Sequence, residues 1–146
     1  MSEQSYLFDT NVLSELRRPR PDPHVLAFYD ALDDACMFTS VMALGELRRG
    51  AELMLRRDVL GGASLVRWIE AVETSFVDRV IGIDREVARL WGRLSAERPR
   101  PVVDTLIAAT AIVHGMTLVT RNVADMRDTG VALIDPWVSS EQENGS

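Results

Sequence analysis

Four acidic residues occupy positions from which their carboxylates could reach a common ligand. Asp9 ends a short apolar run, and Asp104 begins an almost wholly apolar one. Glu46 lies in a segment with helical spacing, and Asp125 follows a later apolar run. Carboxylate oxygens are the ligands that hard divalent cations such as Mg²⁺ and Mn²⁺ prefer in proteins. If the fold gathers these four side chains, their charges repel one another unless such a cation neutralises them.

Each of these acids also has an explanation that needs no ligand. Asp9 can cap the helix that follows it, and Asp104 is favoured at a helix start by the helix dipole. Glu46 lies off the centre of the apolar stripe of its expected helix, so a side chain exposed to solvent is the ordinary explanation. Asp125 lies in a loop-like segment, where an aspartate in a turn is common. A shared role is favoured because segments that follow parallel strands emerge at one sheet edge. Helices that start from this edge can bring Glu46 and Asp104 inward.

The apolar patterns predict strands and helices in alternation. Strands are expected at about 5–8, 37–39, 80–83, 116–119 and 131–134. Helices are expected after residue 9 and over about 23–32, 40–57, 65–72, 85–98 and 104–113, with Asp22, Ser40 and Asp84 as caps and Gly61-Gly62 as a break. This alternation predicts an α/β fold with three α/β/α layers, in which helices cover both faces of a parallel sheet of about five strands.

Length and composition predict a single domain. The 146 residues are 47% hydrophobic, which is enough for one core. We expect this domain to span residues 1–138 and the polar residues 139–146 to form a disordered tail. No basic-then-apolar leader and no apolar run of roughly 18 residues is found, so we expect a soluble, cytoplasmic protein without a membrane partner. The single cysteine, Cys36, and the lack of a Cys/His cluster make disulfide and zinc chemistry unexpected.

The charge pattern limits the possible functions. A net charge of -6 argues against a protein that holds nucleic acid mainly by a basic surface, although clustered carboxylates supply part of it and a bound cation would reverse the local sign. All 16 basic residues are arginines. A P-loop and Schiff-base catalysis both need a lysine, and haloacid-type phosphatases and receiver domains ordinarily depend on one. The lack of lysine in this sequence therefore argues against all four functions. Two arginine clusters, Arg48-Arg49 and Arg17, Arg18 and Arg20, could contact phosphate, although a solvated face is the commoner role for either.

The sequence also resembles the PIN-domain proteins, and more narrowly the VapC/FitB group of toxin-antitoxin ribonucleases. Motifs at residues 8–13, 39–50, 104–109 and 119–125 carry this resemblance, and they occur in the expected order. One departure is Met126, because these proteins more often carry phenylalanine after the last acid. This difference concerns packing more than chemistry.

The resemblance implies a PIN-like fold and a Mg²⁺- or Mn²⁺-dependent endoribonuclease, a hydrolase of RNA phosphodiester bonds. It implies that the catalytic and metal-binding residues are Asp9, Glu46, Asp104 and Asp125. It also implies that the supporting polar residues are Asn11, Ser40, Thr120 and Asn122. The alternative is a PIN-fold partner of a DNA-binding antitoxin that acts mainly in transcriptional autoregulation, with little nuclease activity.

The expected partners are an RNA substrate, a cognate antitoxin and a second copy of the chain. An antitoxin helix is expected in an apolar groove near Leu13, Leu16 and Leu47, with a basic side chain in the acidic site. Apolar side chains such as Trp68, Leu90 and Trp91 are expected to form an exposed patch. Such a patch favours a homodimer, from which a toxin-antitoxin hetero-oligomer could be built.

Overall fold

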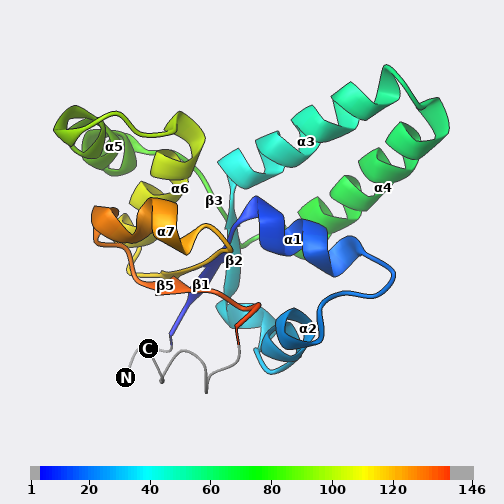
Figure 1. Ribbon diagram of the computed structural model, residues 1–146, viewed down its shortest axis with the longest axis horizontal. Helices are drawn as coiled ribbons and strands as arrows, with labels where there is room; N and C mark the ends of the chain where they lie inside the picture. Colours follow the sequence, from blue (N-terminus) through cyan, green and yellow to red (C-terminus); the bar gives the residue numbers. More distant parts are fainter. Residues whose placement is uncertain (1–3, 139–146) are drawn as a thin grey trace.

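The computed structural model describes residues 4–138 and contains a five-stranded parallel sheet with helices on both faces (Figure 1). The strand order is β3-β2-β1-β4-β5, and every neighbouring pair is parallel. The strands are β1 (Tyr6–Phe8), β2 (Met37–Ser40), β3 (Val80–Ile81), β4 (Thr117–Val119) and β5 (Leu133–Ile134). The predicted α/β fold and its parallel sheet are confirmed, whereas the tail expected at 139–146 lies outside the described residues.

The helices connect these strands and form the outer layers. They are α1 (Thr10–Arg17), α2 (Pro23–Asp30), α3 (Val41–Leu55), α4 (Val59–Ser75), α5 (Arg85–Glu97), α6 (Val102–Val113) and α7 (Val123–Met126), with short 3-10 turns at Asp34–Cys36 and Arg127–Thr129. Figure 1 shows α3 and α4 side by side as a hairpin that projects from the sheet, with α5 and α6 on the opposite side. None of the helices within residues 4–138 has the length and apolar character needed to cross a membrane.

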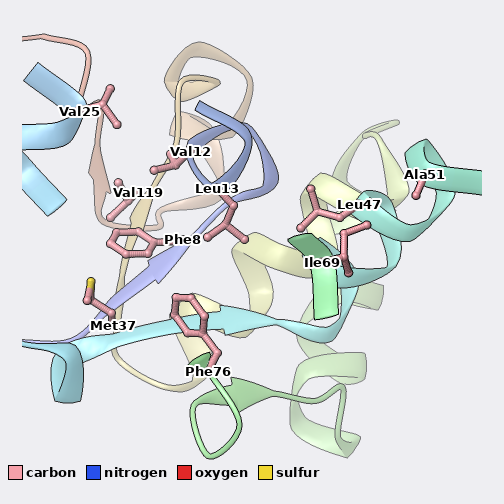
Figure 2. Packing of buried hydrophobic residues seen from close by; sticks show 10 residues of the cluster. All are labelled: Phe8, Val12, Leu13, Val25, Met37, Leu47, Ala51, Ile69, Phe76 and Val119. Atoms are coloured by element: carbon pink, nitrogen blue, oxygen red, sulfur yellow. The ribbon is translucent and has the colours of Figure 1, made fainter. Parts of the chain in front are cut away.

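Two apolar clusters hold the layers together, one on each face of the sheet. Phe8 and Val119 pack against α1, α2 and α4 through residues such as Val12 and Ile69 (Figure 2). The preceding residues of β1 and β4 point to the other face, where they pack against α6 and α7. This alternation follows from the two-residue period of a strand. Each fully buried side chain of this size contributes roughly 1.5–3 kcal/mol, so both faces stabilise the central strands.

Local capping chemistry fixes where several helices begin. Asp22 accepts hydrogen bonds from the backbone N–H groups of His24 and Val25, and Pro23 occupies the first turn of α2. The Ser40 hydroxyl accepts from the N–H of Met42 at the start of α3. Asp84 caps α5 in the same way. These three helices therefore begin where the sequence predicted.

Three sequence expectations require correction. The glycines at 61 and 62 do not separate two helices, because α3 already ends at Leu55 and Asp58 caps α4 three residues before Gly61. Gly62 lies in the first turn of α4, where a Cβ would sit 2.6 Å from the Leu55 side chain, so close packing of the hairpin requires glycine. Asp125 belongs to the single-turn helix α7 and not to a loop. The patch expected at Trp68, Leu90 and Trp91 is half-buried. Leu90 and Trp91 pack between α5 and α6, and Trp68 packs against the cluster that contains Ile69.

Candidate active site

Asp9 lies at the carboxyl end of the central strand, where β1 meets α1. Its side chain is almost wholly buried, with the residue only 2% exposed. One carboxylate oxygen, Oδ1, accepts a hydrogen bond from the backbone N–H of Thr10 at 2.7 Å. The other, Oδ2, accepts from the hydroxyl of Thr120 at 2.8 Å. Asp9 therefore caps α1 and also holds a fixed carboxylate at the edge of the sheet.

Thr120 connects Asp9 to the end of the neighbouring strand β4. Its buried hydroxyl oxygen accepts from Asn11 Nδ2 at 3.3 Å and from the backbone N–H of Asn122 at 3.1 Å. Asn11 Oδ1 in turn accepts from the N–H of Arg121 at 3.2 Å. Because two donors occupy the lone pairs of the hydroxyl, its single proton is directed to Asp9. This network fixes both the position of Asp9 and the direction of the hydrogen bond that it receives.

Thr10 connects the first acid to the second. While its backbone N–H donates to Asp9, its hydroxyl donates to Glu46 Oε1 at 2.8 Å. Glu46 lies in α3 and is half-buried, so it is not the fully solvated side chain expected as its default. Sequence reasoning gave Thr10 no role. Its place directly after the first acid was the available signal, but its contact with Glu46 depends on the pairing of β1 with β2.

Asp104 and Asp125 complete the acidic region from the other side of the sheet. Asp104 lies half-buried in the first turn of α6, and Asp125 lies exposed in α7. Burial raises the pKa of Asp104, and the negative charges of Glu46 and Asp125 raise it further. These charge effects reach Asp104 from α3 and from α7. The fold therefore brings the four predicted acids close enough for their charges to affect one another.

Burial and the nearby acids also shift the pKa of Asp9. Burial raises the pKa of Asp9 from 3.8 to about 6, against the opposing effect of the hydrogen bonds from Thr120 and Thr10. The charges of Asp104 and Glu46 add to the increase. Within residues 4–138, no arginine or histidine forms an ion pair with any of the four acids. Their negative charge is thus not compensated by the described part of the chain.

The four carboxylates are the kind of ligand that a hard divalent cation binds, although their positions in this structure do not form a complete coordination site. Among the described residues, no three His, Cys, Asp or Glu side chains lie in an arrangement that could hold a metal ion as they stand. The four acids nevertheless offer oxygen ligands only, with uncompensated charge, which suits Mg²⁺ or Mn²⁺. The oxygens of Asp9 that accept hydrogen bonds keep further lone pairs for a ligand.

The supporting residues expected from the sequence have different structural roles. Asn11 and Thr120 belong to the network that holds Asp9. Ser40 is buried and caps α3, so it positions the helix that carries Glu46, and it makes no hydrogen bond to an acid in residues 4–138. Asn122 contributes its backbone N–H, while its residue is exposed.

An apolar groove of about 320 Å³ lies near this site, between α1, α2 and α4. Its lining includes Leu13, Leu16, Leu26, Tyr29, Trp68 and Phe76. Leu13 and Leu16 were expected there. Leu47 was expected too, but it packs in the core at 6% exposure and does not line the groove. The reason is that α3 turns this side chain toward α4 in the apolar cluster of Figure 2.

The chain is similar to known proteins in sequence and in structure. The PIN-domain family model matches residues 6–130. Toxin FitB of Neisseria gonorrhoeae is 31% identical over 139 residues, covering 90% of this chain and 97% of that protein. The VapC ribonuclease Y4jK of Sinorhizobium fredii is 32% identical, covering 90% and 96%. The solved structure of FitAB bound to an IR36 DNA fragment contains a chain with a TM-score of 0.81 and 30% identity, covering 92% of this chain and 97% of that one.

Proposed function

Because this chain belongs to the PIN-domain family, in its VapC/FitB group, we propose that it is a toxin that cleaves RNA with a divalent cation. The observation that supports this proposal is that the negative charges of four acids act on one another, although none of the four forms an ion pair within residues 4–138. Asp9 and Asp104 are the most direct candidate ligands. Glu46 is a ligand or the base that orients water, and Asp125 ligates the cation or positions one of its waters.

The chain's own residues prepare this site for hydrolysis. Thr120 and Thr10 hold both oxygens of Asp9, so this carboxylate keeps one orientation. Thr10 also donates to Oε1 of Glu46, which fixes the orientation of this carboxylate, and Oε2 is the less occupied oxygen that can accept a proton from an attacking water. When bound, Mg²⁺ or Mn²⁺ lowers the pKa of a coordinated water and offsets negative charge on the phosphodiester. No histidine has a part in this scheme.

The direct experiment is an RNA cleavage assay in which metal is the variable. Purified protein is incubated with defined tRNA and rRNA fragments in Mg²⁺, in Mn²⁺ and in chelator, and the cleaved ends are mapped. We expect cleavage with either metal and none in chelator. Cleavage that resists chelation would contradict the metal site. A folded, metal-binding protein without any cleavage would favour the alternative role beside a DNA-binding antitoxin in transcriptional control.

We further propose that a cognate antitoxin inhibits the enzyme through two contacts. An amphipathic helix fits the apolar groove between α1, α2 and α4, and an arginine or lysine of the same partner satisfies the acids. Coexpression with the genomic neighbour, followed by removal of that partner's C-terminal basic residues, tests this arrangement. Weaker inhibition is expected as these residues are removed. Full inhibition after all of them are gone would show that inhibition does not use the acidic site and works by blocking the groove or by breaking the dimer.

A further inference from the structure

A second pocket, of about 420 Å³, lies at the C-terminal end of α1. The α1 helix, the segment between α1 and α2, and residues that follow β4 and β5 contribute to it. Its lining includes Glu15, Arg18, Arg20, Asp22, Arg121 and Trp137. We call it the arginine pocket. Three of the chain's arginines meet here, although they come from two segments about 100 residues apart in the sequence.

Arg121 connects the arginine pocket to the hydrogen-bond network around Asp9. It directly follows Thr120, the residue whose hydroxyl donates to Asp9, and consecutive Cα atoms are about 3.8 Å apart. The backbone N–H of Arg121 also donates to Asn11 Oδ1, within the network that holds Asp9. The same segment of chain after β4 therefore contributes to the pocket and to the acidic site.

The charges of the pocket leave two arginines available to a ligand. Glu15 is buried, and its carboxylate accepts from Arg18 at 3.3 Å and from the backbone N–H of Asp22 at 2.9 Å. The Asp22 side chain is engaged in capping α2. Between residues 4 and 138, neither Arg20 nor Arg121 forms an ion pair with a carboxylate. Three arginines against two acids make the pocket positive in a chain whose net charge is -6.

Arg121 is also held in place by an aromatic side chain. Its guanidinium carbon lies 4.9 Å from the centroid of the Trp137 ring. Stacking of this kind restricts the long side chain, so less conformational entropy is lost when the guanidinium binds an anion. Arg20, on the segment after α1, is exposed and forms no side-chain hydrogen bond in the described chain.

We propose that the arginine pocket binds a phosphate group of the RNA strand that enters the acidic site. This inference rests on the proposed function. The planar guanidinium matches phosphate oxygens with paired donors, and Arg20 and Arg121 can supply such donors from two sides. Without a bound cation the four acids repel an RNA backbone, and the net charge of the chain is -6. The arginine pocket supplies positive charge that attracts the strand whether or not a cation is bound.

The test uses the full chain and a fluorescein-labelled single-stranded RNA of mixed sequence. Fluorescence anisotropy in chelator measures binding without metal-dependent cleavage. The double variant Arg20→Gln, Arg121→Gln is compared with Arg56→Gln, Arg57→Gln, which makes the same charge change at exposed residues near the outer end of the α3–α4 hairpin (Figure 1). We expect the pocket variant to bind about tenfold more weakly. Its slope of log K against log salt should be flatter by about 0.7, the value for one phosphate contact on a single strand.

Cleavage kinetics separate this inference from the proposed function. In Mg²⁺, the pocket variant should raise KM about tenfold and change kcat little, because the pocket holds a part of the strand that does not react. If the wild type does not cleave RNA with Mg²⁺ or Mn²⁺, the proposed function fails. If it cleaves while the pocket variant and the hairpin control bind RNA equally, with the same salt slope, the pocket assignment alone is overturned.

Two further measurements keep the result interpretable. Circular dichroism melting establishes that each variant is folded. Should the double variant be unfolded, Arg20→Gln alone replaces it, since this exposed side chain holds no other part of the described chain. Binding of the purified antitoxin is measured in parallel. Loss of antitoxin binding with unchanged RNA binding would assign the pocket to an acidic protein segment and overturn the RNA assignment.

Discussion

The buried carboxylate of Asp9 is expected to make the metal-free protein more stable at about pH 5 than at pH 7. Burial raises the pKa of Asp9 to about 6 in the folded chain, from 3.8 for an unperturbed carboxyl. The folded state therefore holds this proton more tightly than the unfolded state does. Its stabilising effect is complete below 3.8 and is lost as the pH rises through about 6. Most carboxylates behave in the opposite way, because folding lowers their pKa and they stabilise the folded state at higher pH.

The size of the effect follows from the same two pKa values. Their difference corresponds to about 3 kcal/mol in total, and about 1 kcal/mol of it is gained between pH 7 and about pH 5. Residue exposure of only 2% justifies this conversion, because solvent screens the site little. With an m-value of about 1–3 kcal/mol per molar urea, such a gain moves the midpoint of the denaturation curve by several tenths of a molar.

Urea denaturation in chelator at pH 7, 6 and 5 measures the free energy of unfolding. The free energy of unfolding of the wild type should rise by about 1 kcal/mol over this range relative to Asp9→Asn, in which no proton is taken up at this position. Asp30→Asn is the matched control, because this exposed acid makes the same charge change outside the site. Excess Mg²⁺ should remove most of the gain in the wild type, since metal and proton compete for the same carboxylate. Equal pH dependence in the wild type and Asp9→Asn would refute the reasoning.

Two more outcomes follow from the packing and the hydrogen bonds. Thr120→Val should lower kcat/KM for RNA and cost about 1–3 kcal/mol of stability, because it deprives Asp9 of its buried donor; unchanged activity would remove the network from the mechanism. Gly62→Ala should destabilise the chain by about 1–3 kcal/mol in urea denaturation, since its Cβ would lie 2.6 Å from Leu55, whereas Gly50→Ala, with nothing within 4 Å, should not destabilise it. The homodimer expected from the sequence is tested separately, by light scattering at tens of micromolar, and a monomer at that concentration would contradict the expectation.

The sequence was most informative where the chemistry is local. Caps such as Ser40 and Asp84 satisfy backbone groups only two or three residues away, so their positions could be predicted from residue type. The parallel sheet followed from the alternation of apolar runs. Asp9 was identified because it ends one of these runs, and the same position makes it a cap as well as a candidate ligand.

The features that were missed depend on contacts between distant segments. Thr10 meets Glu46 across 36 residues, because β1 pairs with β2 and brings the starts of α1 and α3 together. Gly62 could not be distinguished from a helix breaker without knowing how closely Leu55 approaches it. The arginine pocket combines Arg121 with the segment after α1, and only the order of the sheet places them side by side.

The central claim, that the gathered acids bind the cation that cleaves RNA, is tested most directly by Asp104→Asn. The change keeps the shape of the side chain but removes a charge that a hard cation needs, so metal binding should weaken more than folding does. RNA cleavage is measured over a range of Mg²⁺ concentrations for the wild type, Asp104→Asn and the exposed control Asp30→Asn, with melting curves for each. We expect folded Asp104→Asn without detectable cleavage and full activity in the control. Wild-type cleavage by Asp104→Asn at low Mg²⁺ would contradict the assignment of the site.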